Sequence, residues 1–365
     1  MNNKEIDKIF LFIILILLGI GFSVFISASM GILVKDSALF SSVTFKQAFF
    51  GIILGLIACF VMSKINYKIY KKYALYIFIL SLVAMSLVFI PGIGTTLNGA
   101  KRWIFIFGMS FQPVALLNIG FIIYWSAWLS FAKEKIGTIK YGLIPLVILL
   151  GISGLFLLIQ PDTDSFLVIC ATGAVMYLVA GGKVRYIFLL SMIGIVCLAG
   201  LAFTRPYIMS RIKTYIHPTS DILGAGWQAS QSQIAVGSGQ IFGRGFGQSI
   251  QKFKFLPESI SDSIFAVLGE EMGFIGCVFV VCLFLFFIFR GFKISIRSPD
   301  LFGGLLVLGI VILIAIQSFI NIASALGIIP ISGIPLAFFS QGGTSMFMML
   351  VQLGIVLNVS KYRKS

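Results

Sequence analysis

The chain alternates between long apolar runs and short polar segments. A helix needs about 20 apolar residues to cross a bilayer core, and the runs are near that length. The alternation predicts a single-domain (1–365), all-α polytopic membrane protein with about ten transmembrane helices. Their expected positions are near residues 9–30, 47–63, 73–91, 112–131, 141–159, 165–181, 186–204, 264–289, 302–327 and 342–360.

Composition supports a membrane location. The chain is 59% hydrophobic and 11% charged, whereas soluble domains carry about a quarter of their residues as charged types. The first run lacks an A-x-A cleavage site and is longer than a signal-peptide core, so we expect it to be retained. All five cysteines lie in apolar runs, without metal-ligand spacing, and are expected to be packing residues.

The positive charges predict the orientation. A net charge of +15 is compatible with nucleic-acid binding only if the basic residues cluster on one soluble surface, and here they form short clusters between apolar runs. With the N-terminus inside, seventeen of the 27 basic residues fall in short inner segments. The positive-inside rule therefore predicts that both termini lie on the inner side, and the spread of the basic residues favours no nucleic-acid partner.

One connection is much longer than the rest. Residues 205–262 are rich in Gly and Gln, contain the only histidine (His217), and also carry several aromatic residues. Loops of this length are usually functional or disordered. Because aromatic side chains favour packing, we expect this extracytoplasmic loop to fold over the outer mouth of the bundle.

Residues 258–276 bring carboxylates to the start of a predicted span, where ionisable groups usually mark a functional path. At 3.6 residues per turn, Asp262 and Glu270 share one helix face, about 12 Å apart along the axis, and Glu271 points elsewhere. Glu270 is therefore a candidate substrate-binding residue. Asp262 at a partly dry interface suits a general base for a sugar hydroxyl. An ordinary helix N-cap is the alternative, and caps are the more common role.

Two further segments carry candidate substrate-binding groups. Lys101 and Arg102 stand beside Trp103 in the loop 97–113, where they suit either phosphate binding or anchoring at the headgroup level. In residues 224–258, Gln228, Gln231, Ser232 and Gln233 are candidates for sugar hydroxyls, and Lys252 and Lys254 for a pyrophosphate; solvation is the alternative for all of them.

Two glycine-containing segments remain ambiguous. The GxGxxG-like stretch Gly243–Gly247 follows no βαβ pattern, so a flexible loop is favoured over a dinucleotide site. Residues 327–343 combine prolines and glycines at a membrane boundary, where irregular backbone either lines a cavity or forms a tight turn.

Taken in order, several motifs resemble those of one known family. The segments NGAKRW with FQP, QPDTDS, GAGWQASQSQIAVGSG, GRGFGQSIQKFKFLPE, SDSIFAVLGEEMG and PISGIPLAFFSQGGTS resemble the signatures of the SEDS proteins FtsW, RodA and SpoVE. The resemblance covers nearly the whole chain, and GQSIQKFKFLPE is more similar to FtsW than to RodA.

The resemblance implies a ten-helix glycosyltransferase in the bacterial cytoplasmic membrane. It would polymerise lipid II into glycan strands at the outer face of that membrane, in cell division or cell-shape maintenance. It also implies a class B penicillin-binding transpeptidase and other divisome or elongasome proteins as partners. The proposed catalytic aspartate of the family falls on Asp262, which would deprotonate the acceptor 4-hydroxyl while undecaprenyl pyrophosphate leaves. Candidate groups for the leaving charge are Lys101, Arg102, Arg205, Arg211 and Lys252.

The chain departs from the family pattern at several positions. The Glu and Lys of QPSExxK are Ala115 and Asn118, and the histidine and threonine before the aspartate are Ile260 and Ser261. Other departures are Ser263 for Phe, Asp164 and Ser165 in PDxGT, and Ala337 in PLPF. Losing both members of an ion pair can leave a fold intact, so these changes bear on activity more than on folding.

Two other functions are compatible with the resemblance. A lipid II flippase would place ionisable residues near the bilayer midplane and often shows inverted repeats, neither of which is found in the sequence. A low-activity scaffold that recruits a transpeptidase is the other alternative, favoured by the loss of Glu and Lys. A divalent cation, Mg²⁺ or Mn²⁺, is a candidate cofactor, although the sequence has no ligand cluster for one.

Overall fold

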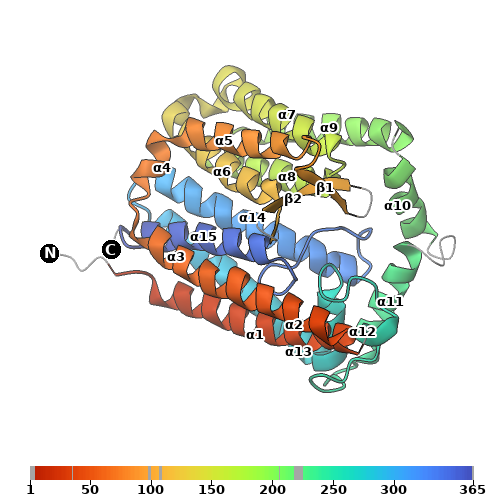
Figure 1. Cartoon of the computed structure of the whole chain (residues 1–365). Helices are drawn as coiled ribbons and strands as arrows, with labels where there is room; N and C mark the ends of the chain where they lie inside the picture. Colours follow the sequence, from red (N-terminus) through yellow and green to blue (C-terminus); the bar gives the residue numbers. More distant parts are fainter. Residues whose placement is uncertain are drawn as a thin grey trace.

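A computed structural model describes residues 5–34, 36–97, 100–106, 109–204, 206–217 and 225–363. Its helices lie side by side in one bundle (Figure 1). Among the described residues, eight helical segments are long and apolar enough to cross a membrane. They are Lys8–Leu33, Ser37–Lys64, Pro113–Gly137, Ile139–Ile159, Val184–Phe203, Ile264–Ile296, Leu301–Ala325 and Gly343–Ser360.

These segments contain most of the helices labelled in Figure 1. The elements are α1 (Lys8–Leu33), α2 (Ser37–Lys46) continuing through η1 (Gln47–Ile53) into α3 (Leu54–Lys64), α6 (Pro113–Ala132) with η2 (Lys133–Gly137), η3 (Ile139–Leu143) with α7 (Ile144–Ile159), α9 (Val184–Thr204), α13 (Ile264–Ile296), α14 (Leu301–Ala325) and α15 (Gly343–Ser360). The short α4 (Lys68–Lys72) follows α3.

The two remaining predicted spans coincide with shorter apolar helices, α5 (Ala74–Leu87) and α8 (Thr163–Val179). At 1.5 Å per residue they are about 21 and 26 Å long, somewhat less than the roughly 30 Å hydrocarbon core. All ten predicted segments are therefore helical, while the count of ten crossings stays a prediction.

Aspartates begin four of the helices. Asp7, Asp36, Asp162 and Asp300 are the N-cap residues of α1, α2, α8 and α14, and each side chain accepts a backbone N–H of the first turn. This contact satisfies one of the donors that a helix start leaves unpaired. Four of the twelve acidic residues thus have a local structural role.

The two described ends of the chain meet. Asp7 pairs with Arg290 at 2.8 Å and with Arg363 at 2.6 Å, and its backbone N–H donates to Ser360 Oγ at 3.0 Å. Both ends therefore lie at the same end of the bundle (Figure 1). An even number of crossings gives this arrangement, which agrees with the predicted placement of both termini on one side.

The expected loop before α6 contains a small antiparallel sheet instead. Strand β1 (Gly94–Leu97) pairs with β2 (Ala100–Ile106), which pairs with β3 (Met109–Phe111). Within β2, Ile104 is buried and Arg102 half-buried, whereas Lys101 and Phe105 are exposed. This alternation is the period of two that a strand imposes, so Lys101 and Arg102 face opposite sides.

The long connection after α9 is largely helical within its described part, rather than a loop. It contains α10 (Pro206–Ile216), α11 (Ala225–Ser238) and α12 (Gln251–Lys254), which lie at the end of the bundle opposite the chain termini (Figure 1). Helix α11 packs against α13. The aromatic residues therefore correctly indicated a packed segment. Its helices were not predicted, because the segment is rich in glycine and glutamine.

Helix α13 is broken at Gly273, where φ is 64° and ψ is −166°. Around the break, the carbonyls of Glu270 and Glu271 accept N–H groups from Arg244 and Gly245, both at 3.0 Å. On the other side, Phe274 and Ile275 donate to carbonyls of residues 240 and 241. An interrupted helix must have its backbone groups satisfied by protein, so the glycine-rich stretch predicted to be a flexible loop is instead bonded to α13.

Candidate functional site

Asp262 lies in the turn that precedes α13, and other elements hold this turn in place. Asn321 on α14 donates from Nδ2 to the carbonyls of Asp262 and Ile334, each at 2.8 Å. Gln341 donates its backbone N–H to Ile260 O at 2.8 Å, and Ser340 Oγ donates to Ser261 O at 2.5 Å. The irregular segment 327–342 and α14 therefore fix the backbone on which Asp262 stands.

Asp262 is not the N-cap of α13. That position belongs to Ser263, whose side chain makes no capping hydrogen bond and instead accepts from Gln228 Nε2 at 3.0 Å. The carboxylate of Asp262 is thus not used to begin the helix. This placement removes the capping alternative that residue chemistry favoured.

Three charged side chains converge beside Gly333. A Cβ placed on Gly333 would lie 3.8 Å from Asp164 Oδ2, 3.9 Å from Asp262 Oδ2 and 4.0 Å from Arg211 Nη2. Arg211 Nη1 also forms an ion pair with Asp164 Oδ2 at 2.7 Å, and the Gly333 N–H donates to the same oxygen at 3.1 Å. Glycine leaves open the space toward which these side chains point.

The surroundings favour the neutral form of Asp262. Burial, followed by the carboxylates of Glu258 and Asp164, raises the pKa of the Asp262 carboxyl to about 7. Arg211 and Arg102 act in the opposite direction. A carboxyl group with a pKa near neutrality is matched to proton transfer at physiological pH.

A cavity of about 80 Å³ extends from Gly333 between residues of α6, α8, α14 and α15. Arg102 and Asp162 line it, with 3.8 Å between Arg102 Nη1 and Asp162 Oδ1. Arg102 also donates to the carbonyls of Gln160 and Pro161. These contacts hold its guanidinium at the cavity wall beside the turn that begins α8.

The same cavity is lined at the two positions that depart from the QPSExxK pattern expected from the resemblance. Ala115 and Asn118 on α6 both line it. Among the described atoms, the buried oxygens Asn118 Oδ1 and Gln352 Oε1, from α6 and α15, have no hydrogen-bond partner. On the α6 side, uncharged side chains therefore line the cavity at the two positions where the resemblance predicts a charged pair.

Residues 327–343 line two cavities, which decides between the alternatives left open for this segment. Gly333, Ile334 and Pro335 line the cavity beside Arg102. Ile329, Pro330 and Ile331 line a second one, of about 60 Å³, together with Arg211. Irregular backbone at this depth is tolerated because it is packed within protein and lines these spaces.

Several predicted binding residues lie around this centre. Arg102, Arg211 and Gln228 are near Asp262 through the contacts given above, whereas Lys101 is exposed on the other face of β2. Gln231 and Ser232 are buried on α11, and Gln233 lines the second cavity. Arg205 and the side chain of Lys254 lie outside the described residues.

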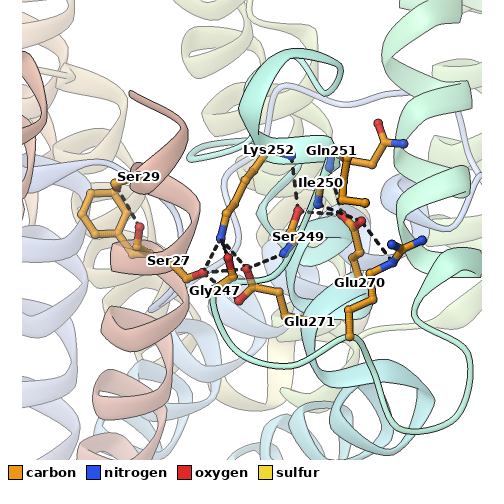
Figure 2. Close-up of polar contacts among 11 residues, drawn as sticks. Ser27, Ser29, Gly247, Ser249, Ile250, Gln251, Lys252, Glu270 and Glu271 are labelled. Carbon is orange, nitrogen blue, oxygen red and sulfur yellow. Dashed lines mark hydrogen bonds and ion pairs between the residues drawn. The ribbon is translucent and has the colours of Figure 1, made fainter. Parts of the chain in front are cut away.

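Lys252 does not fit its predicted role at a pyrophosphate. Its side chain is fully buried, and its ammonium donates to Glu271 Oε1 at 2.7 Å, to Ser27 Oγ at 2.9 Å and to Gly247 O at 2.9 Å (Figure 2). Glu271 also accepts from Ser27 Oγ. The charge of Lys252 is therefore already neutralised inside the protein, between α1 and α13.

Glu270 is likewise occupied by the protein. It accepts hydrogen bonds from Ser249 Oγ at 2.6 Å and from the backbone N–H groups of Ile250 and Gln251 (Figure 2). It also pairs with Arg244 at 3.5 Å. Asp262 precedes α13 and so does not share a helix face with Glu270. Glu270 fixes the loop before α12 and is not available to a substrate in this arrangement.

Among the described residues, no group of three or more His, Cys, Asp or Glu side chains is arranged to hold a metal ion. The candidate divalent cation therefore has no ready protein ligand set in this part of the chain.

Asp164, Gly333 and Asn321 are site residues that sequence reasoning did not select. Asp164 was visible as a departure from PDxGT, and that was the only signal. Asn321 is a polar residue inside an apolar run, which is typical of a buried polar contact in a membrane helix.

Comparison with known proteins identifies the family. The family model FTSW_RODA_SPOVE, described as "Cell cycle protein", matches residues 8–365. The chain belongs to this family. It is similar to Stage V sporulation protein E of Bacillus subtilis, at 36% identity over 98% of each chain. It is also similar to the "Probable peptidoglycan glycosyltransferase FtsW" of Geobacter sp. strain M18, at 38% identity over 86% of each chain.

Solved structures share the fold of this FtsW/RodA/SpoVE member. A chain of a peptidoglycan synthase complex matches with a TM-score of 0.78 and 24% identity, covering 98% of both chains. RodA of Thermus thermophilus matches with a TM-score of 0.72 and 24% identity, covering 99% of this chain and 98% of that one. The chain is therefore a multi-pass membrane protein with a RodA-like fold, and its relatives include proteins named "Probable peptidoglycan glycosyltransferase FtsW".

Proposed function

We propose that this protein is a glycosyltransferase that polymerises lipid II at the outer face of the bacterial cytoplasmic membrane, with Asp262 as its general base. The observation that carries the proposal is the arrangement beside Gly333, where the Asp262 carboxylate, with a pKa near 7, meets Arg211 next to a polar cavity. Membership of a family with named peptidoglycan glycosyltransferases gives this geometry its substrate class.

The chemistry requires one proton transfer and one displacement. The Asp262 carboxylate takes the proton of the acceptor 4-hydroxyl, and the oxygen forms a bond to the anomeric carbon of the donor sugar. The bond from that carbon to the pyrophosphate oxygen breaks, and undecaprenyl pyrophosphate leaves with the electron pair. Among the described residues, the charges of Arg211 and Arg102 lower the pKa of Asp262, so both cations act at this site. They are suited to stabilise the negative charge of the leaving pyrophosphate.

A partner follows from the same reasoning. A structural neighbour belongs to a peptidoglycan synthase complex in which polymerisation and crosslinking are coordinated. We therefore expect a class B penicillin-binding transpeptidase to bind this protein, together with other division or elongation proteins of the membrane.

The test is polymerisation of labelled lipid II by the purified protein with its partner transpeptidase, comparing wild type with Asp262→Asn. Asp36→Asn is a matched control, because it also removes one carboxylate and asparagine remains a good N-cap for α2. Glycan strands from wild type and the control, and a loss of about 10²-fold or more in Asp262→Asn, are expected.

Other outcomes would contradict the proposal. Absence of strands from wild type, where a typical homologue makes them, would refute polymerisation. Lipid II flipping in proteoliposomes that survives Asp262→Asn would favour the transporter alternative. Normal assembly of a transpeptidase complex without any polymerisation would favour the scaffold.

The rate should also depend on pH in a defined direction. A base acts in its deprotonated form, so the initial rate should rise with pH through a midpoint near 7 and then level off. One unit below the midpoint, about a tenth of the plateau rate should remain. A rate that is flat between about pH 5.5 and 8 would exclude Asp262 as the titrating base.

A further inference from the structure

Asp164 stands at the centre of the contacts beside Gly333. It projects from the first turn of α8, and its Oδ2 accepts from Arg211 Nη1 at 2.7 Å and from the Gly333 N–H at 3.1 Å. It is also partly shielded, because its side chain is 18% exposed. One carboxylate oxygen therefore joins α8 to α10 and to the segment 327–342.

The guanidinium of Arg211 pairs with the Asp164 carboxylate and lies near the Asp262 carboxyl. Its Nη1 is bonded to Asp164, while its Nη2 lies 4.0 Å from the Cβ position of Gly333, which is 3.9 Å from Asp262 Oδ2. A planar guanidinium presents several donors in a rigid fork, so fixing one nitrogen orients the other. The contact with Asp164 thus helps to orient the Arg211 guanidinium relative to Asp262.

We propose that Asp164, acting through Arg211, is a positioning residue that tunes the strength of Asp262 as a base. This inference rests on the proposed polymerase function. The groups that face Asp262 come from four elements: Glu258 from its own turn, Asp164 from α8, Arg211 from α10 and Arg102 from β2. Of these four groups, Asp164 is the one that both acts on Asp262 directly and holds one of the opposing cations.

The direction of the effect can be worked out from the charges. Asp164 raises the pKa of Asp262, and Arg211 lowers it. Replacing Asp164 by Asn removes a negative charge that acts on Asp262 and also removes a carboxylate paired with Arg211. Both changes favour the carboxylate, so the pH at which Asp262 loses its proton should fall.

The expected result for Asp164→Asn is an acidic limb of the pH–rate profile shifted to lower pH by about one unit. One unit below the wild-type midpoint, the variant should retain about five times the wild-type fraction of its own plateau rate. Arg211→Gln should shift the limb to higher pH. Asp164→Glu should return the profile toward that of wild type, and Asp36→Asn should leave it unchanged.

Asparagine keeps a carbonyl oxygen that can accept the Gly333 N–H, so the variant tests charge rather than the backbone contact. If Asp164 only tied elements together, its loss would lower the rate or the melting temperature equally at every pH. A variant whose plateau rate falls while the midpoint of its pH–rate profile stays unchanged would therefore overturn the proposal. The proposed polymerase function would still hold in that case, because the wild-type protein would have polymerised lipid II.

A second measurement does not depend on activity. Infrared titration of the purified protein, taken as the difference between each variant and its Asp262→Asn counterpart, reports the protonation of the Asp262 carboxyl. A lower midpoint in Asp164→Asn than in wild type supports the proposal even if wild type makes no glycan. Equal midpoints in the two pairs would refute it.

Discussion

The buried pair of Lys252 and Glu271 predicts a strongly non-additive effect on stability. Both side chains are almost fully buried, at 0% and 1% exposure, and the ammonium and carboxylate are 2.7 Å apart. We consider Lys252→Met, Glu271→Gln and the double variant. Each single change leaves the opposite charge inside the protein with only neutral partners.

The structure allows the magnitude to be estimated. After Lys252→Met, the Glu271 carboxylate keeps Ser27 Oγ and the Ser249 N–H as donors, and after Glu271→Gln the ammonium keeps Ser27 Oγ and Gly247 O. Breaking one partner of a buried pair costs about 3–5 kcal/mol. With about 2.1 cal/mol/K of unfolding entropy per residue, this lowers the melting temperature of the 365-residue chain by roughly 5 °C.

The double variant should cost less than either single one. With both substitutions in place no charge is left in the site, and the new amide at position 271 gives Ser27 a neutral partner, so we expect a loss of about 1–2 kcal/mol. The corresponding interaction energy is several kcal/mol, well above the additivity error of about 0.5 kcal/mol. Thermal unfolding of purified protein in nanodiscs, followed by tryptophan fluorescence, measures all four forms.

Additive losses in this cycle would refute the reasoning, because they would mean that the two charges do not depend on each other. Single variants as stable as wild type would do so too, since they would show that water reaches the site. Wild-type lipid II polymerisation is not needed for either result.

Two further predictions concern the backbone and the chain ends. Gly273→Ala should destabilise the protein by about 1–3 kcal/mol, because φ is +64° there and a Cβ would press on Gly243. Gly194→Ala is the control, and it should be neutral or stabilising because Gly194 lies in an open helical position. Thermal unfolding of the two variants measures the difference. At the chain ends, burial raises the pKa of Asp7, but hydrogen bonds from Arg290 and the Phe10 N–H, with the charges of Arg290 and Arg363, together outweigh it, so the folded pKa is lowered. The stabilisation is therefore present above the unfolded value of about 4 and lost as pH falls through the folded value. Melting temperatures from about pH 7 to 3 should show this loss in wild type and less of it in Arg290→Gln, and identical curves would contradict it.

The sequence predicted the helical framework well because lipid imposes strict demands. A spanning segment must satisfy its backbone internally and must be apolar for about 20 residues, and both demands are visible in a single run of residues. The ten expected segments are all helical for this reason. The small sheet β1–β3 escaped prediction because strands of three to seven residues leave too short a pattern to recognise.

The candidate site was predicted unevenly. Asp262 was predicted from its place at the start of an apolar run, and Arg102 and Arg211 were predicted from their charge alone. Lys252 was predicted to bind the substrate because its charge is visible in the sequence, whereas its ion pair with Glu271 is not. The partner lies on the broken helix α13, and only the fold brings the two together.

By itself, the amino-acid sequence determined that the protein is a membrane protein. It also determined which segments form apolar helices and which family the motifs resemble. Tertiary structure decided which charges neutralise one another and which remain beside a cavity. Asp164, Arg211, Asp262 and Gly333 come from four separate elements and meet at one point. The electrostatic state of a carboxyl group depends on distances of a few ångströms, and such distances between remote residues are set by packing rather than by local sequence.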